Sequence, residues 1–225
     1  MISKEYKKVI IAVISIAVII LLAVLIYSYR DKLSSGEREL FSLPKGTELT
    51  GEEKIKYDSA IKILEENPED IEALIDIAQI KYGLQDIDGS IAVYNKILEI
   101  NPNHVLSLNN LGDMYNQKKE YEKAAEMYLR IIESTPKWIN AYRELGYIYK
   151  YHFPERYYEI EELLLNGIEK FKELEGEAPV DLYSMLAVYY DETEQVEKAI
   201  EYLEIVVELD PNNQPAQQRL EELKQ

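Results

Sequence analysis

The residues with the greatest chemical potential lie in one short stretch, Tyr149–Tyr158, which reads YKYHFPERYY. It gathers four tyrosines, a phenylalanine and one of the chain's two histidines. Histidine is the side chain best suited to acid–base work and metal binding near neutral pH. The other histidine, His104, lies far away in the sequence, and there is no cysteine. The sequence therefore predicts neither a histidine or thiolate metal site nor a cysteine nucleophile.

Other groupings that could support catalysis are equally weak. Adjacent carboxylates occur at Glu161–Glu162 and Glu221–Glu222, but such pairs are common on the outside of helices. No glycine-rich phosphate loop is present, and two isolated histidines do not suggest a Ser-His-Asp arrangement. His104 follows Asn-Pro-Asn at a predicted helix start, where polar residues are expected as caps. We therefore expect a protein that is not an enzyme and that uses no metal and no cofactor.

The charge of the chain is strongly negative and unevenly distributed. The formal net charge is −17, although residues 1–32 hold five Lys and Arg against two Asp and Glu. An acidic domain repels phosphate backbones, so we expect no nucleic-acid partner. The acidic remainder favours basic partners. A solvated surface of charged helices is the alternative explanation.

A long apolar run, Val9–Ile26, precedes this acidic part, and Ser15 is its one residue that is not apolar. As a helix it would span about 27 Å, close to the hydrocarbon thickness of a bilayer. It is longer than a signal-peptide core and ends without a small-residue cleavage motif, so we expect an uncleaved single-pass anchor. Basic residues are balanced on its two sides, but their compact N-terminal grouping favours an N-terminus inside and the remainder on the extracytoplasmic side.

A sequence period dominates the remainder of the chain. Pro68, Pro102 and Pro136 are 34 residues apart, and apolar columns between them repeat at the same spacing. Each unit reads as two antiparallel amphipathic helices, the second ended by a proline. In the second unit, Gly112 leaves space for the partner helix to approach closely. One such hairpin cannot bury its apolar face alone, so the units must stack.

These columns resemble the tetratricopeptide repeat (TPR) family. The first unit departs from the family pattern by having Lys81 at the tyrosine position. The second unit preserves the pattern best, with Leu108, Leu111, Gly112, Tyr115, Ala124, Tyr128 and Pro136. The resemblance implies a TPR-like alpha-alpha superhelix, or solenoid, of about four repeats plus capping helices. Together with the apolar run, it leads us to expect an all-α fold in which an N-terminal transmembrane helix precedes the superhelix. The expected order is a basic segment (1–8), a transmembrane helix (9–29), a linker (30–51), a capping helix or partial repeat (52–70), TPR units (71–104, 105–138, 139–179 and 180–213) and a C-terminal capping helix (214–225).

The third unit departs from the period, because it carries seven extra residues before the fourth unit begins at Val180. Two of them fit the turn between its helices, which leaves Tyr149 and Tyr157 on packing columns. His152 and Phe153 then lie in an enlarged turn at one edge of the stack. They are a candidate contact site for a partner, and an aromatic-stabilised loop is the alternative.

The candidates for partner binding are residues of the first helices that lie outside the packing columns, since these helices line the inner face of stacked hairpins. Asparagine side chains offer donors and acceptors that suit an extended peptide backbone. The predicted partner-binding residues are Gln79, Asn109, Asn110, Asp113, Asn116, Asn140, Arg143, Tyr147 and Lys150. The same residues would also suit a solvated face without a partner.

The sequence thus predicts a non-enzymatic, membrane-anchored scaffold that binds a protein or peptide partner in the concave face of the solenoid. Some family members grip carboxylates with a basic clamp, but Glu144 stands at one of the matching positions and would repel a carboxylate. The alternative is a structural subunit of a membrane or envelope assembly. Such a subunit would act through homo-oligomerisation or through its convex face.

Overall fold

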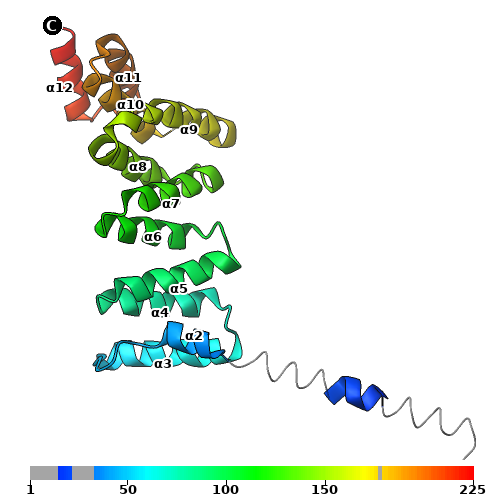
Figure 1. Cartoon of the computed structure of the whole chain (residues 1–225). Helices are drawn as coiled ribbons and strands as arrows, with labels where there is room; N and C mark the ends of the chain where they lie inside the picture. Colours follow the sequence, from blue (N-terminus) through cyan, green and yellow to red (C-terminus); the bar gives the residue numbers. More distant parts are fainter. Residues whose placement is uncertain (1–14, 22–32, 177–178) are drawn as a thin grey trace, which may run out of the picture. The chain divides into compact units, whose positions relative to one another are not determined.

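The described part of the chain is built of helices and the turns that join them. The computed structural model describes residues 15–21, 33–176 and 179–225, and there is no strand among them. Successive helices run antiparallel to one another within the repeats (Figure 1). The chain divides into two compact units, residues 1–102 and 103–225. The all-α helical repeat architecture expected from the sequence is confirmed.

Unit 1 is organised around a hairpin, and its helices are α2 (Ser35–Phe41), α3 (Gly51–Glu66), α4 (Ile71–Gly83) and α5 (Ile87–Ile100). α4 packs against both α3 and α5. Asp70 and Asp86 start α4 and α5, since each side chain accepts a hydrogen bond from a backbone N–H in the first turn. Leu74, Ile77 and Ile97 are fully buried between these helices.

The predicted linker, residues 30–51, is folded where the structure describes it. Ser34 caps α2 through a reciprocal capping box, and α2 packs against α5. Phe41 is fully buried and Leu33 nearly so. The expectation of a linker is therefore corrected for residues 33–50. The serine, glycine and proline residues around these two apolar anchors concealed them in the sequence.

A buried lysine holds this N-terminal segment in place. Lys81 is 4% exposed, and its Nζ donates to the Ser42 carbonyl at 2.6 Å and to Asp86 Oδ2 at 3.1 Å. Tyr57 adds a hydrogen bond from its hydroxyl to the Phe41 carbonyl at 3.1 Å. The departure from the repeat pattern at Lys81 therefore has a structural cause: an ammonium group there ties the preceding segment to the first hairpin.

The predicted membrane anchor, Val9–Ile26, lies largely outside the described residues, as does the basic segment before it. Of this run the structure describes residues 15–21, which are helical and exposed. In the part of the chain that the structure describes, no helix is both long enough and apolar enough to cross a membrane.

Unit 2 continues the series of helical hairpins. Its helices are α6 (Val105–Gln117), α7 (Tyr121–Ser134), α8 (Ile139–His152), the 3-10 turn η1 (Pro154–Arg156), α9 (Glu159–Glu175), α10 (Val180–Glu192), α11 (Val196–Leu209) and α12 (Gln214–Leu223). α6 packs on α7, α10 on α11, and α12 on α11. His104 caps α6 as predicted, because its Nδ1 accepts from the Ser107 N–H at 3.3 Å.

Two glycines allow the helices of a hairpin to approach closely. A Cβ at Gly112 would lie 2.7 Å from the ring of Tyr128, and one at Gly167 would lie 2.9 Å from the ring of Tyr142. In each case a buried tyrosine of one helix covers a glycine of the other. The predicted role of Gly112 is confirmed.

The extra residues of the third unit lengthen its second helix and the turn before it. His152 is the last residue of α8 and does not lie in the turn where the sequence placed it, and Pro154 begins the separate η1 turn. α9 begins only at Glu159 and has 17 residues, against 14 in α7. It ends before Gly176, whose φ of 85° suits glycine.

Candidate functional site

A groove of about 390 Å³ lies between α8 and α10, with α9 beside them, inside unit 2. α8 and α10 each contribute residues three and four positions apart, which places them on one helix face. The lining residues are Tyr142, Arg143, Gly146, Tyr147, Lys150, Tyr151, Tyr157, Ile160, Leu164, Asp181, Ser184, Met185, Val188 and Glu192.

Two ion pairs link α8 to α10 along this groove. Arg143 Nη2 lies 3.5 Å from Asp181 Oδ1, and both side chains are more than half exposed. Lys150 pairs with Glu192, which raises the pKa of the lysine, and the second Glu192 oxygen accepts from the Tyr157 hydroxyl at 2.9 Å. The Lys150 end is therefore held by two bonds and the Arg143 end by one long contact. The Arg143 end is the easier one to open.

The rest of the groove is mainly apolar. Ile160 and Leu164 of α9 are buried, whereas Tyr147 of α8 and Val188 of α10 are 51% and 53% exposed. Tyr151 packs against Tyr147, with ring centroids 4.7 Å apart. Exposed aromatic and aliphatic side chains around a hollow are the usual marks of an interaction site.

Tyr142 forms an uncharged wall of the groove. It is 3% exposed, and its hydroxyl has no hydrogen-bond partner among the described residues. Burial raises the pKa of Tyr142 to about 12, so the hydroxyl keeps its proton at physiological pH. The arrangement gives no sign of a tyrosinate that could act as a base.

A second hollow of about 200 Å³ adjoins the first along α10. Ser184 and Val188 line both. Its other lining residues come from α10, α11, α12 and the turn before α12: Ala187, Asp191, Leu203, Val206, Asn213, Pro215, Ala216 and Arg219. Arg219 donates two hydrogen bonds to Asp191, both 2.8 Å, which tie α12 to α10.

The asparagine-rich set on α6 is engaged within its own hairpin. Asn109 donates to Asp113 Oδ2 at 3.0 Å, and Asn110 donates to a backbone carbonyl of α6 at 2.7 Å. Asp113 Oδ1 accepts from the Tyr128 hydroxyl at 2.6 Å. Asn116 lies half-buried on the same helix. None of these four predicted residues lines the groove.

The predicted residues on α8 do meet at the groove, since Arg143, Tyr147 and Lys150 line it. Asn140 lies at their edge and accepts from Arg143 Nη1 at 2.9 Å. Gln79 belongs to unit 1, where it is exposed and accepts a hydrogen bond from Lys56 of α3 at 3.1 Å. The structure therefore brings together the α8 part of the predicted set.

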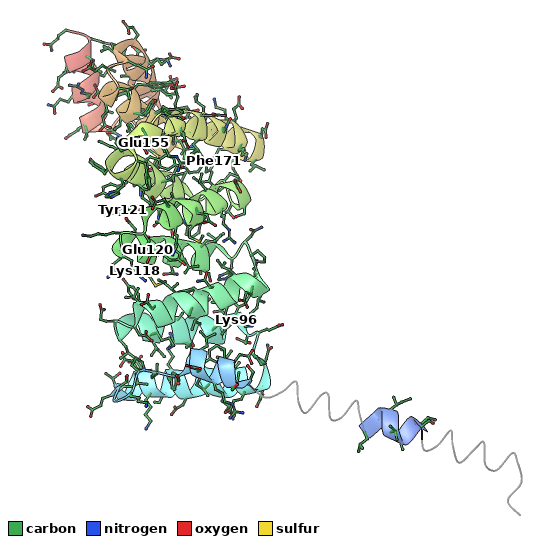
Figure 2. All side chains as sticks on the ribbon, viewed as in Figure 1. Lys96, Lys118, Glu120, Tyr121, Glu155 and Phe171 are labelled. Carbon is green, nitrogen blue, oxygen red and sulfur yellow. The ribbon has the colours of Figure 1, made fainter. Side chains whose placement is uncertain are left out.

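The two predicted edge residues pack within unit 2. The His152 ring is stacked on that of Tyr121, with centroids 3.5 Å apart and 9° between the planes. Figure 2 shows Tyr121 next to Glu120, where α7 begins. Phe153 meets Tyr149 edge-on, with centroids 6.5 Å apart. Both rings thus hold α8 in place.

On the α10 side of the groove, sequence reasoning placed Ser184 on the inner face but missed the residues around it. Met185, Val188 and Glu192 all line the groove. The signal was present, because Val188 occupies in the fourth unit the position of Tyr147 in the third, 41 residues earlier. Aligning the two first helices position by position would have paired them.

The described residues contain no group of three or more His, Cys, Asp or Glu side chains that could hold a metal ion. The groove itself offers paired charges and apolar surface. These features suit the binding of a polypeptide segment better than a bond-making step.

Family models described as "Tetratricopeptide repeat" match this chain. One matches residues 71–104 and 180–213, and a second matches residues 93–126. Repeats of this class stack into scaffolds with binding surfaces and are typically non-catalytic. No protein with a curated description matches.

Solved structures are similar to this chain. A crystal structure of MamA is 17% identical and covers 72% of this chain and 94% of its own, with a TM-score of 0.50. A second, titled "Crystal structure of MamA protein", is 25% identical and covers 67% and 78%, with a TM-score of 0.49. YrrB, titled "a TPR protein with an unusual peptide-binding site", is 20% identical and covers 72% and 97%, with a TM-score of 0.40. The family matches identify tetratricopeptide repeats at residues 71–126 and 180–213, and the helical hairpins of the described residues agree with them.

Proposed function

We propose that this protein is a non-enzymatic scaffold that binds a segment of a partner protein in the groove between α8 and α10. The observation that carries the proposal is the shared wall formed by Val188. This half-exposed side chain lies between the 390 Å³ groove and the 200 Å³ hollow, so apolar surface continues across α10. Large exposed apolar side chains at such a place favour a protein partner.

The test is a substitution at the centre of this surface. Val188→Asp in the full chain should abolish capture of the native partner from extracts of the source cells, because a desolvated carboxylate would face the bound segment. Leu174→Asp is the matched control, since Leu174 of α9 is 59% exposed and does not line the groove. Equal recovery of the same partner by both variants would overturn the assignment of the groove.

We further propose that Val9–Ile26 anchors the scaffold in a membrane, with the repeats on the extracytoplasmic side. The support is the apolar run in the sequence and the basic residues before it. The double variant Ile16→Arg and Ile20→Arg should move the full chain out of the membrane fraction, because each arginine costs about 3 kcal/mol near the bilayer centre. Protease cleavage of the repeats in intact cells tests the orientation. Carbonate extraction of the wild-type chain would contradict the anchor.

A further inference from the structure

The Arg143 end of the groove carries an excess of negative charge. Asp181 of α10 faces Arg143 at 3.5 Å. Glu144, the next residue on α8, also interacts electrostatically with Arg143 and with Asp113 of α6. Two carboxylates, Asp181 and Glu144, therefore interact with one guanidinium group, and a third, Asp113, repels Glu144. Burial and then repulsion from Asp113 raise the pKa of Glu144, whereas Arg143 lowers it. A further cation would relieve this repulsion.

Of the α10 carboxylates in this region, Asp181 has the most unused capacity for hydrogen bonds. Both oxygens of Asp191 accept from Arg219, and both oxygens of Glu192 accept, from Lys150 and from Tyr157. Asp181 accepts one long bond, from Arg143. A carboxylate has room for about four donors, so Asp181 can accept an incoming ammonium or guanidinium group while Arg143 stays nearby.

The net charge of unit 2 also favours a cationic ligand. Residues 103–225 contain 13 Lys and Arg side chains against 25 Asp and Glu. Such a surface attracts cationic segments and repels acidic ones over about a Debye length. An incoming carboxylate at Arg143 would also be repelled by Asp181 and Glu144.

We propose that the groove selects partner segments that carry a lysine or arginine, which docks beside Asp181 and Glu144 while its apolar neighbours cover Met185 and Val188. This inference rests on the proposed function, because it names the chemistry of the segment that the groove binds. Arg143 acts in it as an internal competitor, since it pairs with Asp181, the carboxylate that the incoming cation also uses.

Three fluorescent ten-residue peptides test the proposal against the detergent-solubilised full chain. They share a Leu-Phe centre and blocked ends, and differ in carrying two lysines, two glutamines or two glutamates beside it. By fluorescence anisotropy, the lysine peptide should bind at least about tenfold more tightly than the glutamate peptide, and this ratio should shrink in high salt. Arg143→Gln should tighten lysine-peptide binding severalfold, because it removes the competitor. Tighter binding of the glutamate peptide, weaker lysine-peptide binding to Arg143→Gln, or no binding by the lysine peptide would overturn the proposal.

A charge-matched pair of variants separates the groove from the general field. Glu144→Gln with Asp181→Asn should weaken lysine-peptide binding about tenfold. Glu169→Gln with Glu173→Gln, on the exposed part of α9, removes the same charge away from the groove and should have little effect. Equal effects of the two pairs would overturn the local site. If all three peptides bind with equal affinity and Val188→Asp abolishes the binding of each, the cation preference is overturned and the groove assignment stands.

Discussion

The hydroxyl of Tyr128 donates a 2.6 Å hydrogen bond to Asp113, while the ring of the same tyrosine covers Gly112. One side chain of α7 thus holds α6 by packing and by a charge-assisted bond. Burial, and then the bond to Asp113, raise the pKa of Tyr128, so it remains a donor at physiological pH. The second repeat depends on this contact.

Gly112→Ala should destabilise unit 2 by about 1–3 kcal/mol, because the new Cβ would lie 2.7 Å from the Tyr128 ring and would force the helices apart. Gly146→Ala is the control. Its Cβ would meet its nearest neighbour, an Ile160 carbon, at 3.9 Å, so the gain in helix propensity of about 1 kcal/mol should stabilise the chain. Urea unfolding followed by circular dichroism measures both; a stabilising Gly112→Ala would contradict the tight contact.

Two buried tyrosines should respond in opposite ways to loss of the hydroxyl. Tyr128→Phe removes the hydroxyl that donates to Asp113 Oδ1 and should cost about 1–3 kcal/mol. Tyr142→Phe removes a buried hydroxyl that has no partner among the described residues, so it should be neutral or stabilising by up to about 1 kcal/mol. The free energies of unfolding of the two variants provide the comparison. Equal losses would show that the Tyr142 hydroxyl is satisfied in solution.

Lys81→Met should detach the N-terminal segment of unit 1. The substitution leaves the Ser42 carbonyl and Asp86 without the buried ammonium group, which should cost about 2–3 kcal/mol. Hydrogen exchange over residues 34–42 should then accelerate. Lys56→Met is the control, since the Lys56–Asp76 pair is exposed and should contribute less than about 1 kcal/mol. Unchanged exchange in Lys81→Met would contradict the role of this lysine.

Glu144→Gln should stabilise unit 2 at neutral pH. Because the pKa of Glu144 is raised in the folded state, the fold binds a proton more readily than the unfolded chain, and stability falls as pH rises through the raised pKa. The variant lacks this penalty. Its advantage should be below about 1 kcal/mol for a half-exposed group and should vanish below the ordinary glutamate pKa of about 4.3.

Glu159→Gln should instead lower the free energy of unfolding at neutral pH. Arg156 lowers the pKa of Glu159 through a hydrogen bond, so the wild-type carboxylate stabilises the fold at neutral pH and loses that effect on acidification. Denaturation curves from pH 3 to pH 8 should therefore converge for both variants at the acidic end. A destabilising Glu144→Gln at neutral pH would contradict the proposed repulsion.

The hairpin architecture was predictable, because it follows from apolar spacing that the sequence repeats four times. The role of Gly112 and the cap at His104 were also predictable, since each depends on neighbours within one unit. The folded segment before α3 was not. Its anchors, Leu33 and Phe41, are single apolar residues among turn-forming ones, and the lysine that ties the segment to the hairpin follows 39 residues after Ser42.

The candidate site was predictable on one side. Helical spacing identified the α8 residues Arg143, Tyr147 and Lys150, but it could not show that Asn110 would bond to its own backbone. Nor did it identify Met185, Val188 and Glu192 on α10, although Val188 occupies the repeat position of Tyr147.

The shared position of Ser184 and Val188 between two hollows has a thermodynamic consequence. A ligand that moves the Val188 side chain from one side changes the shape of the other hollow, so the two binding free energies are linked. The linkage is reciprocal. If a ligand in the groove changes the affinity of the hollow beneath α12 for its own ligand, that second ligand changes the affinity of the groove by the same factor. A ligand bound beneath α12 would therefore change the affinity of the groove through Val188.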